Sequence, residues 1–287
     1  MAKIVVIGSI NIDLVTTCEH FPTVGESMFG QTFAVYCGGK GANQAVCAAK
    51  LGAEVTMVGC IGNDANGETA IKNLAMHQIN TAYVQRVSEP TGVALIIVAQ
   101  QDNEIVVIKG ANACVTPEVV DLALPAIKQA DMIMLQLEIP LKTVEYVVDL
   151  AAVLQKPVML NPAPYQPIEA DLINKVTYLT PNQIEVRQIF GEDYSTALAH
   201  YPNKVIMTAG SSGVYFHDGH ELGLIPAHEV KVVDTTGAGD TFNGALAVAL
   251  VSRMSLRSAI DFAQKAAGIA IGKMGAQTAM PILTEMQ

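Results

Sequence analysis

Near its start the chain contains Lys3-Ile-Val-Val-Ile-Gly8, in which four consecutive residues are apolar and β-branched. Such a run is typical of a strand buried on both faces of a parallel sheet. The residues that follow, Ser9-Ile-Asn-Ile-Asp13, place polar side chains just beyond the carboxyl end of this strand, where open α/β sheets bind their ligands. Asn11 and Asp13 are therefore candidates for gripping vicinal hydroxyl groups, unless they simply form a polar strand edge.

Strand and helix patterns alternate along much of the remaining chain. The pairs lie at 55–60 and 68–77, 132–135 and 143–154, 158–160 and a short helix, and 176–179 and 184–190. Repeated βα units predict a doubly wound, mostly parallel central sheet with helices on both faces. An Ala-rich helix at 42–51 precedes these units, and two long helices at 238–251 and 256–274 close the chain.

A second set of strands does not fit the central sheet. Segments 12–17 and 27–35 have weaker, alternating patterns, and segments 91–98 and 104–108 form a predicted hairpin. We expect a single α/β domain over 1–287 into which a small β-sheet lid is inserted, with its strands at about 12–36 and 91–108. Further strands are predicted at 205–208, 214–217, 221–225 and 231–233.

Composition narrows the classes of partner. Hydrophobic residues make up 51% of the chain and charged residues 15%, which supplies a large core and excludes disorder. The net charge of −10 argues against nucleic acid, because phosphate backbones bind clustered Lys and Arg. No stretch stays apolar for the ~20 residues of a membrane span, and the five scattered cysteines lack a CxxC pair. We therefore expect a cytoplasmic protein without a membrane or nucleic-acid partner.

The segment Asp234-Thr-Thr-Gly-Ala-Gly-Asp-Thr-Phe-Asn-Gly-Ala245 predicts phosphate chemistry. A glycine-rich turn opens an Ala-rich helix, so the free amides of Ala238, Gly239 and Asp240 point outward at a positive helix end. Such a nest suits charge developing on a transferred phosphoryl group. Asp240, in the first turn, could then take a proton from an attacking hydroxyl. The alternative is that Asp240 only stabilises the helix and the glycines only shape a loop.

A second glycine-rich segment, Gly38-Gly-Lys-Gly-Ala-Asn43, lets the backbone approach a ligand and brings Lys40 and Asn43 to a helix start. It is not a P-loop, because neither Gly-Lys pair of the chain is followed by Ser or Thr. A dinucleotide fingerprint is also absent after the first strand, which ends in the single glycine Gly8. A nicotinamide dehydrogenase is thereby disfavoured.

Several motifs together resemble the ribokinase family of carbohydrate kinases, in family order and across essentially the whole chain. They are Gly8-Ser-Ile-Asn-Ile-Asp13, Gly38-Gly-Lys-Gly-Ala-Asn-Gln-Ala45, Asn161-Pro-Ala-Pro164, Thr180-Pro-Asn182 and the segment 234–245. The resemblance implies transfer of the ATP γ-phosphoryl group to the primary hydroxyl of a pentose, with ribose favoured. It also implies a homodimer formed through the lid.

The resemblance assigns roles position by position. Asp240 would be the catalytic base, beside an anion hole formed by Gly237, Ala238 and Gly239. The sugar would be bound by Asn11, Asp13, Gly39, Lys40, Gly41, Asn43, Glu138 and Asp240. The nucleotide would be bound by Asn182, Thr208, Gly210, Ser211, Gly213, Gly239 and Gln264. Asn182 and Glu185 would position Mg²⁺ largely through water.

A monovalent cation, usually K⁺ in the family, is also implied. Its ligands would be mainly backbone carbonyls around Asp234, Thr236, Ala270, Lys273, Gly275 and Ala279. Ala279 departs from the family pattern, which often places a serine there. The stretch 193–203 is also shorter than in many relatives.

Other functions stay open. Within the family, the acceptor could be deoxyribose, a ketohexose, a 2-keto-3-deoxy acid or a nucleoside. In a different class, the protein could be a catalytically silent sugar- or nucleotide-binding regulator. Asp240 and the intact glycine turn argue against that class.

Overall fold

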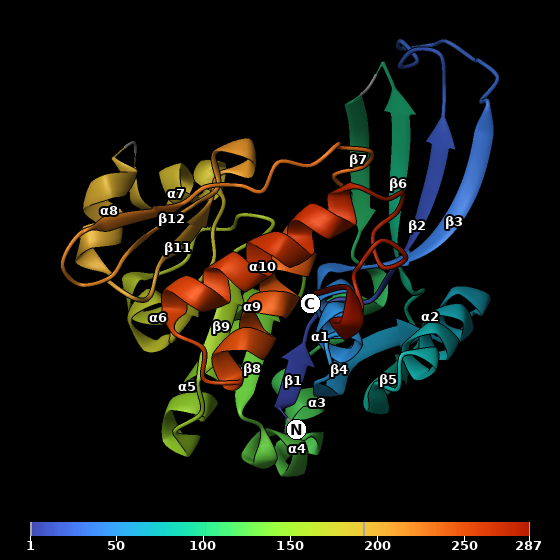
Figure 1. The fold of residues 1–287 in the computed structure, drawn as a ribbon. Helices are drawn as coiled ribbons and strands as arrows, with labels where there is room; N and C mark the ends of the chain where they lie inside the picture. The colour runs from blue at the N-terminus through green and yellow to red at the C-terminus, as the bar shows by residue number, and fades with distance from the viewer. Residues whose placement is uncertain (1, 101, 192, 287) are drawn as a thin grey trace.

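A computed structural model describes residues 2–100, 102–191 and 193–286. Its centre is a six-stranded parallel sheet in the order β10-β9-β8-β1-β4-β5 (Figure 1). The strands are β1 (Lys3–Ile7), β4 (Glu54–Gly62), β5 (Asn80–Val87), β8 (Met132–Gln136), β9 (Val158–Asn161) and β10 (Tyr178–Leu179). The predicted doubly wound α/β fold is confirmed.

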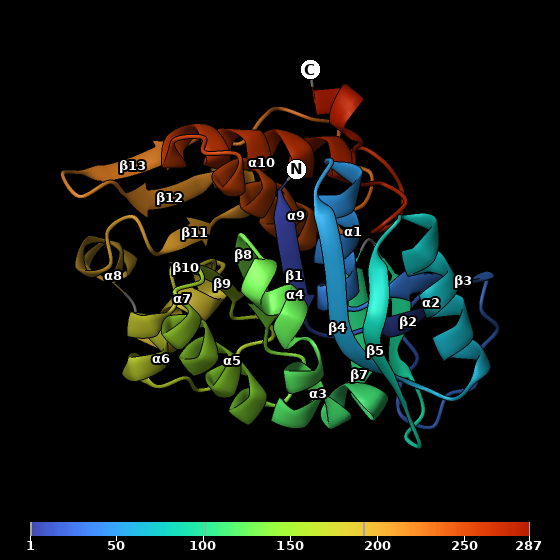
Figure 2. The ribbon, with the colours of Figure 1, turned by 90° about the horizontal axis from the view of Figure 1, so that it is seen from below.

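Helices cover both faces of this sheet, as Figure 2 shows. Alternate residues of β1 point to opposite sides: Ile4 and Val6 belong to one buried cluster, and Val5 and Ile7 to another. The first cluster includes residues of α1 (Lys40–Lys50), α2 (Ala65–Met76), α9 (Ala238–Val251) and α10 (Leu256–Ile271). The second includes residues of α3 (Pro117–Leu122), α4 (Leu124–Gln129), α5 (Leu141–Leu154), α6 (Ala170–Lys175), α7 (Gln183–Phe190) and α8 (Tyr194–His200). Each fully buried Ile or Val contributes about 1.5–3 kcal/mol to the free energy of unfolding.

An antiparallel sheet continues the central one beyond β10. It contains β11 (Ile206–Thr208), β12 (Val214–His217) and β13 (Leu222–Ile225). Single parallel bridges at Leu179–Val205 and Asn182–Thr208 join its first strand to the region of β10. The turn after β11 therefore lies next to the start of α7.

The strands that do not fit the central sheet form a sheet of their own, which projects away from the helices (Figure 1). Its order is β3-β2-β6-β7, with β2 (Asn11–Thr17), β3 (Thr32–Gly38), β6 (Gly92–Ala99) and β7 (Asp102–Ile108). β2 pairs parallel with β6, and both outer strands pair antiparallel with their neighbours. Because β2 follows β1 after only three residues, Asp13 lies close to the carboxyl edge of the central sheet.

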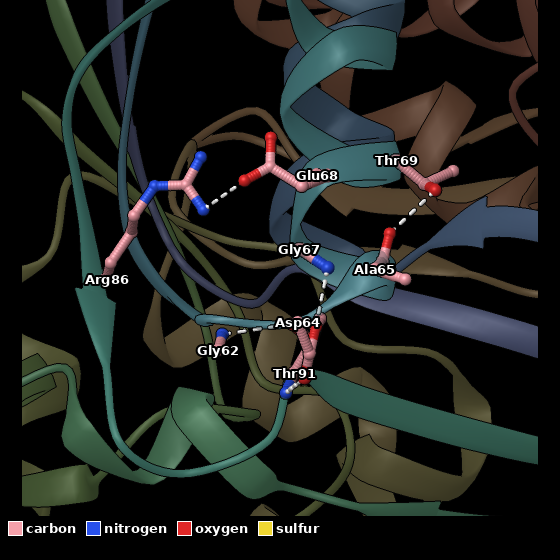
Figure 3. Close-up of polar contacts among 8 residues, drawn as sticks. All are labelled: Gly62, Asp64, Ala65, Gly67, Glu68, Thr69, Arg86 and Thr91. Carbon is pink, nitrogen blue, oxygen red and sulfur yellow. Dashed lines mark hydrogen bonds and ion pairs between the residues drawn. The ribbon is translucent and has the colours of Figure 1, made fainter.

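A polar junction ties the start of β6 to the start of α2 (Figure 3). The Asp64 carboxylate accepts from the Gly67 amide at 2.7 Å, and so caps α2. It also accepts from the Thr91 amide at 2.8 Å and from the Thr91 hydroxyl at 2.7 Å. The same Thr91 hydroxyl accepts from the Gly62 amide at 2.9 Å. One carboxylate thus connects β4, α2 and the four-stranded sheet.

Some sequence predictions are wrong in detail. The predicted strand at 231–233 does not form: the amides of Val233 and Asp234 donate instead to the Ile271 carbonyl at the end of α10. Val232 and Val233 remain 56% and 50% exposed. Their preference for a strand has no effect here, because no neighbouring strand in the described structure pairs with this segment. The last long helix ends at Ile271, three residues early, and the strand predicted at 27–35 begins only at Thr32.

Other elements were not predicted, or begin elsewhere. Strand β5 and the short helices α3 and α4 were missed. The helix predicted at 42–51 begins two residues earlier, at Lys40, directly after Gly39, whose φ is +88°. Among the helices of the described residues, none is long and apolar enough to cross a membrane.

Candidate active site

Asp240 lies in the first turn of α9, buried where this helix meets α1. Its Oδ2 accepts from Asn43 Nδ2 at 2.9 Å, and its Oδ1 accepts from Gln44 Nε2 at 3.1 Å. Burial raises the pKa of Asp240, while the charge of Lys40 and these two hydrogen bonds lower it. The net direction is upward. The carboxylate is therefore fixed in orientation and more basic than an exposed one.

Lys40 is the cation at the centre of this site. Burial lowers the pKa of its ammonium, but the carboxylates of Asp240, Glu138, Glu185 and Asp13 raise it, and the net direction is upward. Lys40 therefore stays charged, with several acidic groups close enough for their charges to act on it. A cation placed this way can also attract an anionic ligand.

Asp13 faces the same cluster from β2. Burial, and then the charges of Glu138 and Asp240, raise its pKa to about 7, against a smaller opposing effect of Lys40. Gly38 makes room for it, because a Cβ at that position would clash with the Asp13 carboxylate. The sequence-predicted Asp13 and Lys40 are thus brought together with Asp240.

Glu138, two residues beyond β8, joins the segment after β1 to the glycine-rich segment 38–43. Its Oε2 accepts from the Ser9 hydroxyl and, at 3.0 Å, from the Lys40 amide. The Ser9 hydroxyl in turn accepts from the Gly41 amide at 3.2 Å. A Cβ at Gly41 would lie 2.6 Å from the Ser9 nitrogen, so only glycine lets α1 start this close to the end of β1.

Asn11 is positioned by a residue that sequence reasoning missed. Asn112, in the 3₁₀ turn Gly110–Cys114, donates its amide to Asn11 Oδ1 at 2.7 Å. Asn112 Oδ1 also accepts from the Ile10 amide at 2.8 Å. No pattern around Asn112 distinguishes it in the sequence, because its role depends on a contact with residues about 100 positions earlier.

A polar cavity of about 160 Å³ adjoins Asp240. Its walls include Lys40, Asn182, Glu185, Thr235, Gly237, Ala238, Gly239 and Asp240. The predicted nest needs one correction: the Ala238 amide donates to the Thr235 carbonyl at 3.2 Å. Within the described residues, the amides of Gly239 and Asp240 have no hydrogen-bond acceptor. These two amides remain free to meet an anion at the helix start.

Asn182 and Glu185 form a reciprocal cap at the start of α7. Asn182 Oδ1 accepts from the Glu185 amide at 2.9 Å, and Glu185 Oε2 accepts from the Asn182 amide at 2.8 Å. Burial raises the pKa of Glu185, against opposing effects of the Asn182 bond and the Lys40 charge. Within the described part of the chain, the second Glu185 oxygen has no hydrogen-bond donor, so it can face a ligand in the cavity.

A larger cavity of about 560 Å³ shares Thr208, Thr235, Ala238 and Gly239 with the first. The predicted nucleotide residues Gly210, Ser211, Gly213 and Gln264 also line it. Its walls come from the turn after β11, the segment after β13 and the faces of α9 and α10. Its size suits a drug-sized or nucleotide-sized ligand.

Gln264 has a role that its position in the sequence did not reveal. Its Nε2 donates to the carbonyls of Ile225 at 2.6 Å and Pro226 at 3.0 Å. The side chain therefore holds the segment after β13 as the cavity wall, and its amide nitrogen is already committed to that wall.

Only some of the residues predicted to surround a monovalent cation are linked to one another by hydrogen bonds. Asp234 accepts from the Thr236 amide and from the Gly275 amide, both at 2.9 Å. The Ala270 carbonyl accepts from the Lys273 amide at 3.0 Å. The Lys273 ammonium pairs with Glu285 at the surface, and Ala279 is buried without a hydroxyl to offer.

The family model described as pfkB family carbohydrate kinase matches residues 1–283. The chain belongs to this family. Ribokinase of Bacillus subtilis is 44% identical over 289 residues, which cover 100% of this chain and 99% of the relative. The structure of Arabidopsis thaliana ribokinase complexed with ribose and ATP is 34% identical, with a TM-score of 0.91 over 100% of this chain and 98% of that one.

Deoxyribokinase of Salmonella typhi is also similar, at 35% identity over 98% of this chain and 96% of the relative. The protein is thus a carbohydrate kinase, and the family resemblance read from its motifs is confirmed. The kinase places Asp13, Lys40, Glu138, Glu185 and Asp240 around one another. The glycines of 237–239 separate this cluster from the larger cavity.

Proposed function

We propose that this kinase transfers the γ-phosphoryl group of ATP to the primary hydroxyl of ribose, with Asp240 as the general base. One observation carries the assignment of the site: the Asp240 carboxylate, Lys40 and the Gly239 backbone share a small cavity that adjoins a nucleotide-sized one. The names of the ribokinase relatives support ribose as the acceptor.

In this proposal the sugar lies between the polar side chains at the ends of β1 and β8. Asp13 and Glu138 accept hydrogen bonds from its hydroxyls, and Asn11 donates to one through its Nδ2, because its Oδ1 already accepts from Asn112. Asp240 accepts the proton of the attacking hydroxyl. A bond forms between the sugar oxygen and the γ-phosphorus while the bond to the leaving ADP oxygen breaks. Asp240, raised in basicity by burial, ends the step protonated.

Charge on the transferred group is balanced by donors of this chain. The free amides of Gly239 and Asp240 and the ammonium of Lys40 face the region where that charge develops. Asn182 and Glu185 would position Mg²⁺ through water, and the ion would supply further positive charge on the phosphate oxygens. The Glu185 carboxylate is buried, and only one of its oxygens takes part in the cap of α7, so the other oxygen could serve this role.

K⁺ activation is a separate part of the proposal. The contacts of Asp234 with Thr236 and Gly275 hold two predicted carbonyl-bearing segments together beside the anion hole. Since Ala279 offers no hydroxyl, the ion would be held by carbonyls. Measuring turnover in K⁺ and in a large organic cation tests this point: equal rates would reject K⁺ activation.

The four-stranded sheet serves in this proposal as a lid and as a dimer interface. Phe33, Val35, Leu95 and Val106 are 44–67% exposed on one face of this sheet, an unusual apolar patch for a monomer. Closure would exclude water from the sugar site. Sedimentation of wild type and of Leu95→Glu tests the interface; a wild-type monomer would contradict it. We also propose that the protein is located in the cytoplasm.

The general-base role is tested with Asp240→Asn. We expect turnover to fall about 10²- to 10⁴-fold, with ATP binding close to that of wild type. A purified, folded variant with full activity would reject the assignment.

The identity of the sugar is tested by comparing ribose and 2-deoxyribose, each with ATP and Mg²⁺, in the same assay. Deoxyribose phosphorylation is the second candidate activity, because the similar Salmonella protein is a deoxyribokinase. A higher kcat/KM for 2-deoxyribose than for ribose would favour it. Absence of ADP release with every sugar would indicate a silent binding protein.

A further inference from the structure

The Asp240 carboxylate is held by two primary amides, and each of these amides is held by another. On one side Asn43 donates to Oδ2; on the other Gln44 donates to Oδ1. Asn43 and Gln44 are neighbours in α1, but their partners come from distant parts of the chain. The site therefore contains two chains of amides that end on the same carboxylate.

The first chain runs from α2 to the base. Asn73 Nδ2 donates to Gln277 Oε1 at 2.6 Å, and Gln277 Nε2 donates to Asn43 Oδ1 at 2.8 Å. A carboxylate can only accept, so Asn43 must turn its NH₂ group toward Asp240. Its oxygen then needs a donor, which Gln277 supplies. Without that donor, the Asn43 oxygen would be buried and unpaired, or would compete for another partner.

The second chain is fixed at a backbone carbonyl. The Thr180 carbonyl accepts from Asn161 Nδ2 at 3.0 Å, so Asn161 Oδ1 must face Gln44 Nε2, at 3.2 Å. This contact favours the orientation in which the Gln44 NH₂ group faces Asp240, and Gln136 completes it, because its Nε2 donates to the Gln44 oxygen at 2.7 Å.

The orientation of Gln136 leaves one of its own buried polar atoms without a partner. Its side chain is fully buried, and its Oε1 has no hydrogen-bond partner within the described part of the chain. A buried, unpaired amide oxygen is unfavourable. Its presence is explained if the donor at the other end of the same amide is needed.

We propose that Gln136 and Gln277 are positioning residues for the catalytic base, which orient Gln44 and Asn43 so that both Asp240 oxygens always meet N–H donors. Neither glutamine lines the two cavities beside Asp240. Their effect is to favour the anionic, proton-accepting form of a buried carboxylate. The other charged or titratable groups acting on or beside Asp240 are Lys40 and Cys47 of α1, Glu138 after β8, and Asp13 of β2.

The inference rests on the proposed function, in which Asp240 must be deprotonated to act. Replacing either glutamine by Met should move the acid limb of kcat/KM for the sugar upward by about half to one pH unit. That corresponds to a three- to tenfold loss at acid pH. At high pH, kcat/KM should return to within about twofold of wild type, because Asp240 is then anionic in every variant.

Stability distinguishes positioning from packing. Gln136→Met removes one unpaired oxygen and leaves another, that of Gln44, so we expect little change in Tm. Thr143→Val is the control: it deletes a buried hydrogen bond of 2.7 Å from α5 to the Val115 carbonyl, on the face of the sheet opposite α1 and α9. It should lower Tm without moving the acid limb. The double variant Gln136→Met/Gln277→Met should show the sum of both shifts, because the two chains end on different oxygens.

Different results would reject the positioning role of the two glutamines and the proposed kinase activity. Activity losses that are equal at all pH values, with an unmoved acid limb, would show that the glutamines only pack the core and would overturn the positioning role. A wild-type enzyme that phosphorylates no sugar would instead reject the proposed function. If Gln277→Met fails to fold, Gln136→Met alone decides, because its expected Tm is close to that of wild type.

Discussion

Replacing Asp13 by Asn should stabilise the free protein in a pH-dependent way. The pKa of Asp13 is raised from its ordinary value of 3.8 to about 7 by burial and by the charges of Glu138 and Asp240. A folded-state pKa above the unfolded value means that stability is fully present below about pH 4 and is lost as pH rises toward 7. At about 1.4 kcal/mol per pH unit, holding the anion in place costs ~4 kcal/mol above pH 7.

Asn has the same shape but no charge, so the cost disappears in the variant. We expect Asp13→Asn to exceed wild type in free energy of unfolding by ~2 kcal/mol at pH 5.5 and by ~4 kcal/mol at pH 8.5. Urea unfolding followed by circular dichroism at both pH values measures this difference. Glu54→Gln, which removes an exposed carboxylate on β4, is the matched control for loss of one negative charge. The same Asp13→Asn protein should lose most sugar phosphorylation.

Two results would refute this reasoning. An advantage of equal size at pH 5.5 and 8.5 would show that charge is not the cause. A variant less stable than wild type at pH 8.5 would show that the carboxylate makes a favourable contact in the free protein. Either result would remove the claim that the buried Asp13 anion destabilises the free protein at high pH.

Three further changes test other parts of the molecule. Gly213→Ala should raise KM for ATP and lower Tm, because φ is +100° there and a Cβ would clash with the Ile225 carbonyl; an unchanged KM would contradict this role. Asp64→Ala should lower the free energy of unfolding by about 1–3 kcal/mol, since it removes a helix cap and the partner of Thr91; thermal denaturation measures it. Asn112→Leu should raise KM for the sugar with little effect on KM for ATP, and a selective rise in the latter would argue against its contact with the sugar side.

Local sequence predicted several elements well because their signals are short-range. The apolar run of β1 and the Ala-rich start of α1 follow from composition and period alone. The segment 231–233 shows where such reasoning fails. Its valines favour a strand, but 231–233 pair with no strand among the described residues, and the amides of Val233 and Asp234 donate to the Ile271 carbonyl at the end of α10. Tertiary contacts therefore overrode local preference.

The sequence by itself determined the fold class, the glycine-rich turns and the acid at position 240. Each depends on residues adjacent in the chain: an uninterrupted apolar strand, a turn that only glycine permits, and a carboxylate in the first helical turn. Only the tertiary structure decided which side chains surround that acid. Asn112, Gln136 and Gln277 come from far along the chain, and an isolated amide carries no local pattern. Hydrogen-bond direction inside a core is set by which donors and acceptors meet there, and that is a property of the folded chain.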